Sequence, residues 1–126
     1  NVCIRSGVTL TVTSSGFIKL LDDVKIVVEP GAKLIVDGGT LTNNCGDFWQ
    51  GIELQGNNDL SQLTPGAQGQ VILKNGAVIE NAMDGITTIG KVENPENWDW
   101  SKTGGIIKAE NSTFRNCRRG IQFLSY

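Results

Sequence analysis

The residues best suited to chemistry in this chain are two tryptophans in a polar loop. Trp98 and Trp100 flank Asp99, and Asn97 precedes them. An indole ring can stack on a sugar ring while neighbouring carboxylate and amide groups bond the sugar hydroxyls. We therefore predict a glycan-contacting site at this loop. The alternative is that both indoles fold back and cover the flank of the protein, and the sequence alone leaves both interpretations open.

A second candidate is the adjacent pair Arg118 and Arg119. Guanidinium groups bind carboxylates through two parallel hydrogen bonds, so this pair, together with Lys91 or Lys102, could hold an acidic sugar. The simpler interpretation is a basic corner that faces solvent.

Catalysis is not expected from this chain. It contains no His, which removes the commonest general base and most zinc sites. Glycoside hydrolysis needs two facing acids, but the repeat described below aligns Glu53 with Thr87 rather than with another acid. We predict no catalytic residue, no metal site and no cofactor. Calcium binding stays open as an alternative that no cluster of carboxylates indicates.

Composition limits the kind of protein that carries these residues. The 126 residues have a formal net charge of -2, which gives no electrostatic reason to expect nucleic acid or an anionic membrane as a partner. No apolar run reaches the roughly 20 residues of a membrane span. The 16 Gly residues, and the lack of sustained helical periodicity, favour short strands joined by tight turns with little or no helix.

An internal repeat organises the chain. The segment 72–89 aligns with 107–124, and 34–43 aligns with 72–81, while a weaker first copy covers 8–20. Repeats of this length are typical of solenoid proteins. The alignment gives three columns of equivalent residues: Leu34, Ile72 and Ile107; Leu41, Ile79 and Phe114; and Asn43, Asn81 and Asn116.

Each copy reads as three short strands, of which one follows a Gly-Ile pair and the others surround the two apolar columns. No two-residue hairpin joins them, so each strand is expected to pair with its equivalent one coil away. We predict a single all-β domain over 1–126, a right-handed parallel β-helix of about four coils with three short strands per coil. An antiparallel sandwich would show the same alternation but gives no reason for the copies to match column by column.

The Asn and Gly positions of the repeat are expected to be structural. An Asn at a turn tolerates left-handed backbone and can bond the Asn of the next coil, so Asn43, Asn81 and Asn116 are predicted to form a ladder. The Gly before each Ile is expected to supply positive φ or close approach. The variable residues between the Asn and the Gly are expected to face solvent.

Two insertions, 56–69 and 90–104, fall between the first and second strands of successive copies. They are expected to emerge on one edge of the solenoid, where repeat proteins commonly place binding surfaces. Trp49 lies outside them and is predicted to pack inside. Cys45 and Cys117 fall two coils apart, about 10 Å, beyond disulfide reach; all three cysteines, Cys3 included, are expected to be small buried hydrophobes.

The runs 28–57, 69–86 and 104–117 resemble right-handed β-helix segments of large secreted and cell-surface proteins of Bacteroidetes, often exported by the type IX route. The elements Trp-Gln-Gly-Ile (49–52) and Ile-Glu-Asn-Ala (79–82) carry the resemblance, which covers about 8–123. It implies an extracellular location and a pectin-lyase-like fold. It does not imply pectin cleavage, because no catalytic motif of pectate lyases or polygalacturonases matches residue by residue.

Two functions from different classes follow. The preferred one is a non-enzymatic, extracellular structural or adhesive module that contacts a polysaccharide or a cell-surface protein through its edge loops. The alternative is part of a polysaccharide lyase or glycoside hydrolase whose active residues lie on other coils. The ends show no cap, so we expect a fragment of a longer chain, with neighbouring coils or an end-to-end second copy as partners.

Overall fold

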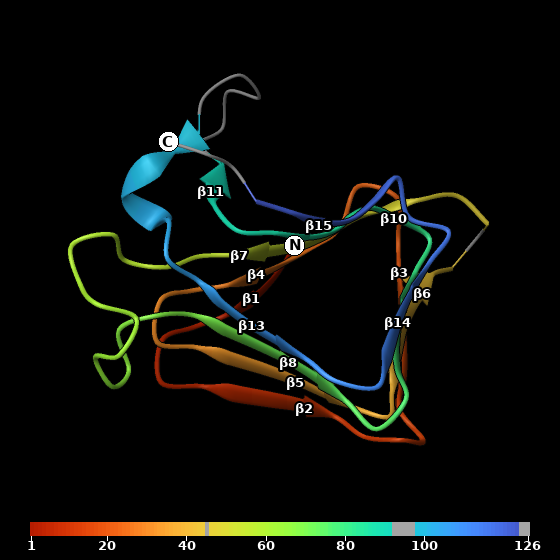
Figure 1. The fold of residues 1–126 in the computed structure, drawn as a ribbon. Coiled ribbons are helices and arrows are strands. Elements are labelled where there is room, and N and C mark those ends of the chain that lie inside the picture. The colour runs from red at the N-terminus through yellow and green to blue at the C-terminus, as the bar shows by residue number, and fades with distance from the viewer. Residues whose placement is uncertain (45, 92–97, 124–126) are drawn as a thin grey trace.

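The computed structural model describes residues 1–44, 46–91 and 98–123, which form an all-β solenoid. Figure 1 looks down its axis and shows a triangular section, with one parallel sheet on each side. The chain visits the three sheets in turn and then advances to the next coil, and its winding is right-handed, as crossovers between parallel strands almost always are. The predicted three-stranded parallel β-helix is confirmed.

We call the three sheets A, B and C. Sheet A contains β1 (Val2–Ile4), β4 (Lys25–Val28), β7 (Trp49–Leu54), β10 (Ala82–Thr87) and β15 (Arg119–Gln122), in that order. Sheet B contains β2 (Thr9–Val12), β5 (Lys33–Asp37), β8 (Gln70–Lys74) and β13 (Ile106–Ala109). Sheet C contains β3 (Phe17–Leu20), β6 (Thr40–Asn43), β9 (Ala77–Glu80) and β14 (Ser112–Arg115). A hairpin of β11 (Gly90–Lys91) and β12 (Trp98–Asp99) and a 3-10 turn, η1 (Trp100–Lys102), complete the described elements.

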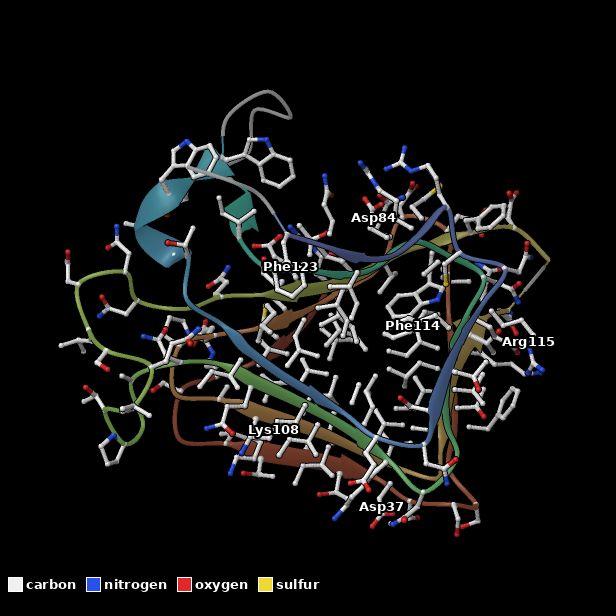
Figure 2. All side chains as sticks on the ribbon, in the orientation of Figure 1. Asp37, Asp84, Lys108, Phe114, Arg115 and Phe123 are labelled. Atoms are coloured by element: carbon white, nitrogen blue, oxygen red, sulfur yellow. The ribbon has the colours of Figure 1, made fainter. Side chains whose placement is uncertain are left out.

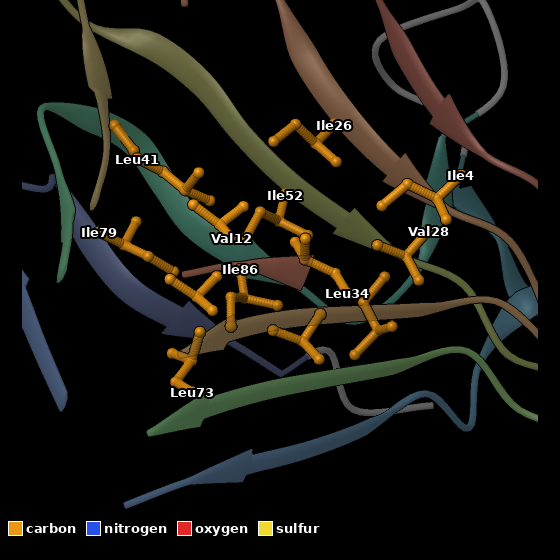
Figure 3. Packing of buried hydrophobic residues seen from close by; sticks show 14 of the residues in the cluster. Ile4, Val12, Ile26, Val28, Leu34, Leu41, Ile52, Leu73, Ile79 and Ile86 are labelled. Carbon is orange, nitrogen blue, oxygen red and sulfur yellow. The ribbon is translucent and has the colours of Figure 1, made fainter. Parts of the chain in front are cut away.

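Alternate residues of the strands of sheets A, B and C face the interior. On sheet A, Ile26, Ile52 and Ile86 stand in one register column, and each is at most 1% exposed. Burying an isoleucine side chain stabilises the fold by roughly 1.5–3 kcal/mol, so such columns supply the main driving force. Figure 3 shows these residues meeting the interior side chains of the other two sheets.

The apolar column predicted for sheet C is confirmed. Leu41 pairs with Ile79, which pairs with Phe114. Trp49 is also buried as predicted, with no exposed surface, and its Nε1 donates a hydrogen bond to the Glu80 carbonyl at 2.9 Å.

The column predicted for sheet B is wrong by one residue. Leu34 pairs with Val71, which pairs with Ile107, so Val71 occupies the interior place expected for Ile72. Val71 is fully buried, whereas Ile72 is half-buried on the outer face. Three residues, 75–77, separate Lys74 from Val78, whereas two, 38–39, separate their register partners Asp37 and Thr40, and a block alignment does not detect this extra residue.

The three predicted ladder residues lie at the corner between sheets C and A. Asn116 Nδ2 donates to Asn81 Oδ1 at 2.7 Å, and Asn81 Nδ2 donates to Thr42 Oγ1 at 3.0 Å. Asn43 Nδ2 donates to Asp22 Oδ1 at 3.0 Å. Asn81 and Asn116 have φ values of 57° and 51°, in the left-handed region. Side-chain hydrogen bonds therefore link the coils at this corner through mixed partners.

The two insertions lie side by side at the edge where sheet A passes into sheet B (Figure 1). Gly56 N donates to the Lys102 carbonyl at 2.7 Å, and Asn58 N donates to the Ser101 carbonyl at 3.1 Å. These backbone bonds join the two loops to each other.

Gln68 organises the first of these loops from inside. It is only 3% exposed, and its Oε1 accepts from Asn57 N at 2.7 Å. Its Nε2 donates to the carbonyls of Asn57 and Leu60 at 2.8 and 2.9 Å. A single buried amide thus holds both halves of the loop, which gives the edge a defined shape.

The cysteines differ from expectation. Cys3 is exposed, because it alternates with the buried Ile4 on β1 and points outward. Cys117 is half-buried and packs against the core, whereas Cys45 lies outside the described residues. The prediction of burial is wrong for Cys3.

The register of sheet B can be tested by comparing two truncations. Val71→Ala is expected to lower the free energy of unfolding by about 2–3 kcal/mol, because it leaves a cavity in the core. Ile72→Ala is expected to cost less than about 1 kcal/mol, because its side chain lies outside. Urea unfolding of both variants measures the difference, and a larger loss for Ile72→Ala would contradict this register.

Candidate functional site

The outer face of sheet A carries the buried polar residues Glu53, Asp84 and Thr87. Its outward side chains form two columns: Lys25, Gly51, Asp84 and Arg119 in the first, and Cys3, Val27, Glu53, Thr87 and Gln122 in the second. Glu53, Asp84 and Thr87 are each no more than 5% exposed, although they point away from the core. We call this surface the sheet A face.

A hollow of about 300 Å³ opens on this face. It lies where Gly51 interrupts the first column, so that no side chain stands between Lys25 and Asp84. Its walls are Asn1, Asp23, Lys25, Gln50, Ile52, Glu53 and Thr87. The lining therefore mixes hydrogen-bond donors and acceptors around a floor of backbone.

A β-bulge creates the hollow. Asp84 pairs with Gly51 but Ile86 pairs with Ile52, which leaves Gly85 as the extra residue. Gly51 has a φ of 100°, and a Cβ at this position would lie 1.6 Å from the Asp84 carbonyl oxygen. At Gly85 a Cβ would lie 2.4 Å from the Gly120 carbonyl oxygen. Close approach therefore requires glycine at Gly51 and Gly85, as the repeat predicted, whereas a Cβ at Gly120 would lie at an ordinary contact distance, 3.4 Å, from the Phe114 ring.

Glu53 forms the acidic wall of the hollow and is paired within the chain. Its Oε2 accepts from Lys25 Nζ in an ion pair, and its Oε1 accepts from Gln55 Nε2 at 2.8 Å. The carboxylate is almost completely shielded from water, with 6% of the side chain exposed. A buried carboxylate is tolerated when such partners satisfy its charge.

Asp84 lies beyond the hollow, on the outer side of sheet A (Figure 2). Two arginines of the last coil hold it through ion pairs. Arg119 donates through Nε to Oδ1 at 2.6 Å and through Nη2 to Oδ2 at 3.3 Å, and Arg118 Nη2 donates to Oδ2 at 2.9 Å. Burial alone would raise the pKa of Asp84, but the hydrogen bonds and charges of Arg119 and Arg118 outweigh it and lower that pKa. The carboxylate stays ionised at neutral pH.

This pairing corrects the expectation that the residues between Asn and Gly face solvent. Ala82 and Asp84 are 0% and 4% exposed. The sequence contained the signal, because Asp84 and Arg119 occupy the same place in aligned copies, each directly before the Gly. Equivalent positions lie about 4.8 Å apart in neighbouring coils, so opposite charges there predict an ion pair.

Comparing residues only within one register column also missed the relation between Glu53 and Asp84, which lie in neighbouring columns. Glu53 pairs with Thr87 and Asp84 pairs with Gly51, so the acids stand on adjacent strands two positions apart. Strand spacing and rise place their Cα atoms roughly 8 Å apart. Sequence columns cannot show this diagonal relation.

The predicted tryptophan site lies at the opposite end of the sheet A strands from the arginines. Strand β11 packs against β7, and β12 pairs with β11. Trp98 is half-buried and Trp100 is 43% exposed. Asp99 caps η1, because its Oδ1 accepts from Ser101 N at 3.2 Å and from Ser101 Oγ at 2.5 Å.

The other predicted partners are not brought together. Asn97 lies outside the described residues. Lys102 lies in η1 beside the tryptophans, far along the strand direction from Arg118 and Arg119. Lys102, which the sequence grouped with the arginines as a possible site for an acidic sugar, therefore lies in a separate region from them.

The described residues contain no group of three or more His, Cys, Asp and Glu placed to hold a metal ion. Over the same ranges, no helix has the length and apolar character needed to cross a bilayer. Searches for similar proteins found no match, since no family model, curated protein or solved structure is significantly similar to the chain.

The bulge can be tested with a matched pair of glycine substitutions. Gly51→Ala is expected to lower the free energy of unfolding by about 3 kcal/mol or more, because positive φ and a backbone clash act together. Gly76→Ala, with a φ of 85° and open space around its Cβ, is the control. It should cost only about 1 kcal/mol. Equal losses in urea unfolding would refute the close approach at Gly51.

The Asp84 cluster predicts a defined pH dependence. Asp84→Asn is expected to lower the free energy of unfolding at pH 7 by about 1–3 kcal/mol, because charged hydrogen bonds are lost. The folded pKa lies below the ordinary value of 3.8, so the stabilisation is complete above that value and disappears as the pH falls through the folded pKa. Unfolding of both proteins between pH 7 and pH 2 measures this difference, and a difference that grows in acid would contradict it.

Proposed function

We propose that this chain is a non-enzymatic structural or adhesive module of an extracellular β-helix. It holds a polysaccharide along the sheet A face and along the edge that carries Trp98 and Trp100, which we call the tryptophan edge. The observation that carries the proposal is the Gly51 hollow, whose buried acid, Glu53, is already paired within the chain, while the second acid of its lining, Asp23, is exposed to solvent. Glu53 is bonded to Lys25 and Gln55. A paired, shielded carboxylate suits hydrogen bonding to hydroxyls better than proton transfer.

The size and chemistry of the hollow support a small polar ligand. About 300 Å³ is at the lower end of the range for ligand pockets. Lys25, Gln50 and Thr87 offer donors and acceptors around its mouth. At the end of the second column, Gln122 Oε1 is buried and has no hydrogen-bond partner among the described residues.

The tryptophan edge extends this surface with an aromatic group. Trp100 is 43% exposed, and its carbonyl is fixed by Thr103, which donates through Oγ1 at 3.1 Å. The loop behind it is bonded to the first insertion at Gly56 and Asn58. A rigid, partly exposed indole loses little conformational entropy when it stacks on a sugar ring.

Partners at the two ends belong to the same proposal. Within the described residues, β1, β2 and β3 are the outermost strands at one end of the sheets, and β15, β13 and β14 at the other. Free strand edges pair readily with further strands. We propose that neighbouring coils of a longer chain, or a second copy, cover them. The extracellular location rests on the resemblance of the repeats to secreted β-helix segments.

A glycoside hydrolase or polysaccharide lyase is the second candidate. It is favoured by the diagonal arrangement of Glu53 and Asp84 on adjacent strands. Inverting glycosidases hold two carboxyl groups across the substrate from each other, and the general acid needs a raised pKa. Here Glu53 turns to Lys25 on β4 and Asp84 turns to Arg119 on β15, so the two carboxyl groups point toward opposite neighbouring strands. The pKa of Asp84 is lowered, because the arginines outweigh burial, which makes it unsuited to donate a proton.

The proposal predicts that glycan binding depends on the indoles. Replacing Trp98 and Trp100 with Ala is expected to weaken binding to neutral polysaccharides about tenfold, because stacking is lost. Leu63→Ala is the control, since Leu63 is 91% exposed on the neighbouring loop. Affinity electrophoresis in gels containing each polysaccharide measures the retardation.

Size-exclusion of the polysaccharides after incubation with the protein separates the two functions. Unchanged polymer length with indole-dependent retardation supports the binding module. Shortened polymer would overturn it in favour of the enzyme. Absence of retardation on every polysaccharide would refute glycan binding.

A further inference from the structure

We infer that Arg118 and Arg119 form a preorganised site for an oxyanion, a carboxylate or sulfate group carried on a polymer, with Asp84 as the residue that positions both guanidinium groups. The site lies at the opposite end of the sheet A strands from the tryptophans. It therefore does not depend on the glycan binding proposed for that edge.

Asp84 holds the guanidinium groups of Arg118 and Arg119 side by side. Asp84 is 4% exposed and uses both oxygens on the two arginines, at distances of 2.6 to 3.3 Å. The arginine side chains are themselves 53% and 45% exposed. One buried carboxylate thus anchors two partly exposed guanidinium groups side by side, and the entropy of ordering them is already spent on folding.

Arg118 and Arg119 keep N–H donors that Asp84 does not use. A guanidinium group has five N–H donors, and Asp84 occupies one on Arg118 and two on Arg119. In the described ranges no other hydrogen bond or ion pair involves either side chain. Exposed donors on two neighbouring forks suit a ligand with several acceptor oxygens in one group, which is the arrangement of a carboxylate or a sulfate ester.

The last coil carries net positive charge around Arg118 and Arg119. One carboxylate between two arginines leaves a single net positive charge. Only Glu110 is acidic after residue 104, against four basic residues, although the whole chain has a net charge of -2. Arg115, the nearest other arginine in sequence, is paired with Glu80 at 2.9 Å. The positive potential of the last coil is therefore concentrated where Arg118 and Arg119 have spare donors.

The effect of removing the Asp84 charge distinguishes a preorganised arginine site from non-specific electrostatic attraction. If only net charge mattered, removing the Asp84 charge would strengthen anion binding. If Asp84 positions the arginines, its removal weakens binding although the protein becomes more positive. These opposite signs make Asp84→Asn the decisive variant.

The test uses three polymers with one backbone: dextran, carboxymethyl-dextran and dextran sulfate. Calorimetric titration of the full chain at about 0.15 M salt, where charges more than about 8 Å away are screened, is expected to show binding to at least one anionic polymer and no arginine-dependent binding to dextran. Arg118→Gln with Arg119→Gln is expected to weaken that binding about tenfold. Lys108→Gln with Arg115→Gln removes two charges from the same coil and should change it less than about twofold.

Asp84→Asn is expected to weaken anion binding about threefold or more, because the forks lose their anchor. Circular dichroism checks that this variant is folded. If it is not, Arg118→Lys with Arg119→Lys replaces it, since lysines keep the charge but not the forks, and the same weakening is expected.

Binding of one anionic polymer alone names the group, carboxylate or sulfate, and supports the site. Equal losses of affinity in Arg118→Gln with Arg119→Gln and in Lys108→Gln with Arg115→Gln would indicate non-specific electrostatic attraction. That result would overturn the proposed site. Stronger binding by Asp84→Asn, or no binding of either anionic polymer by the unmodified chain, would overturn it as well. None of these outcomes involves the tryptophans, so glycan binding at the edge stands or fails separately.

Discussion

The structure depends on one constraint, the parallel pairing of each strand with its equivalent one coil away. Every residue in a strand then has as neighbours the residues at the same place in the coils above and below. Leu41, Ile79 and Phe114 follow this rule in the core. Since neighbouring coils are only about 4.8 Å apart, each column must satisfy size and charge together. A side chain of the wrong size or charge at one position therefore disturbs its contacts with both neighbouring coils.

The same constraint explains the polar outer face of sheet A. Asp84 and Arg119 are register partners, and opposite charges at such a position attract, whereas like charges would repel. Lys25 reaches diagonally to Glu53 because Gly51 beside it has no side chain. The repeat therefore keeps its Asn and Gly, which the backbone requires, and lets the residues between them alternate in charge. This face joins the coils from outside as the apolar columns do from inside.

The bulge at Gly51 and Gly85 connects the fold to a candidate ligand site. It bends the pairing of β7 and β10 and leaves the hollow between charged neighbours. The tryptophan edge and the arginine pair then lie at the two ends of one face, since the strands of sheet A run between them. The hollow lies on β4, β7 and β10, with Gly51 in the same register column as Arg119 and two strands away from it.

The repeat in the sequence determined the fold class, the three strands per coil, the burial of Trp49 and the edge on which both insertions emerge. It did not determine the register of sheet B, because 71–73 are all apolar and hide the alternation that separates Val71 from Ile72. Nor did it determine the burial of Asp84: the aligned copies indicate Arg119 as its partner, but the second arginine, Arg118, and the shielding of the carboxylate from water follow from the packing of the coils. Only the tertiary structure decided these points, because a one-residue corner insertion and an ion pair between coils depend on which strands meet in space.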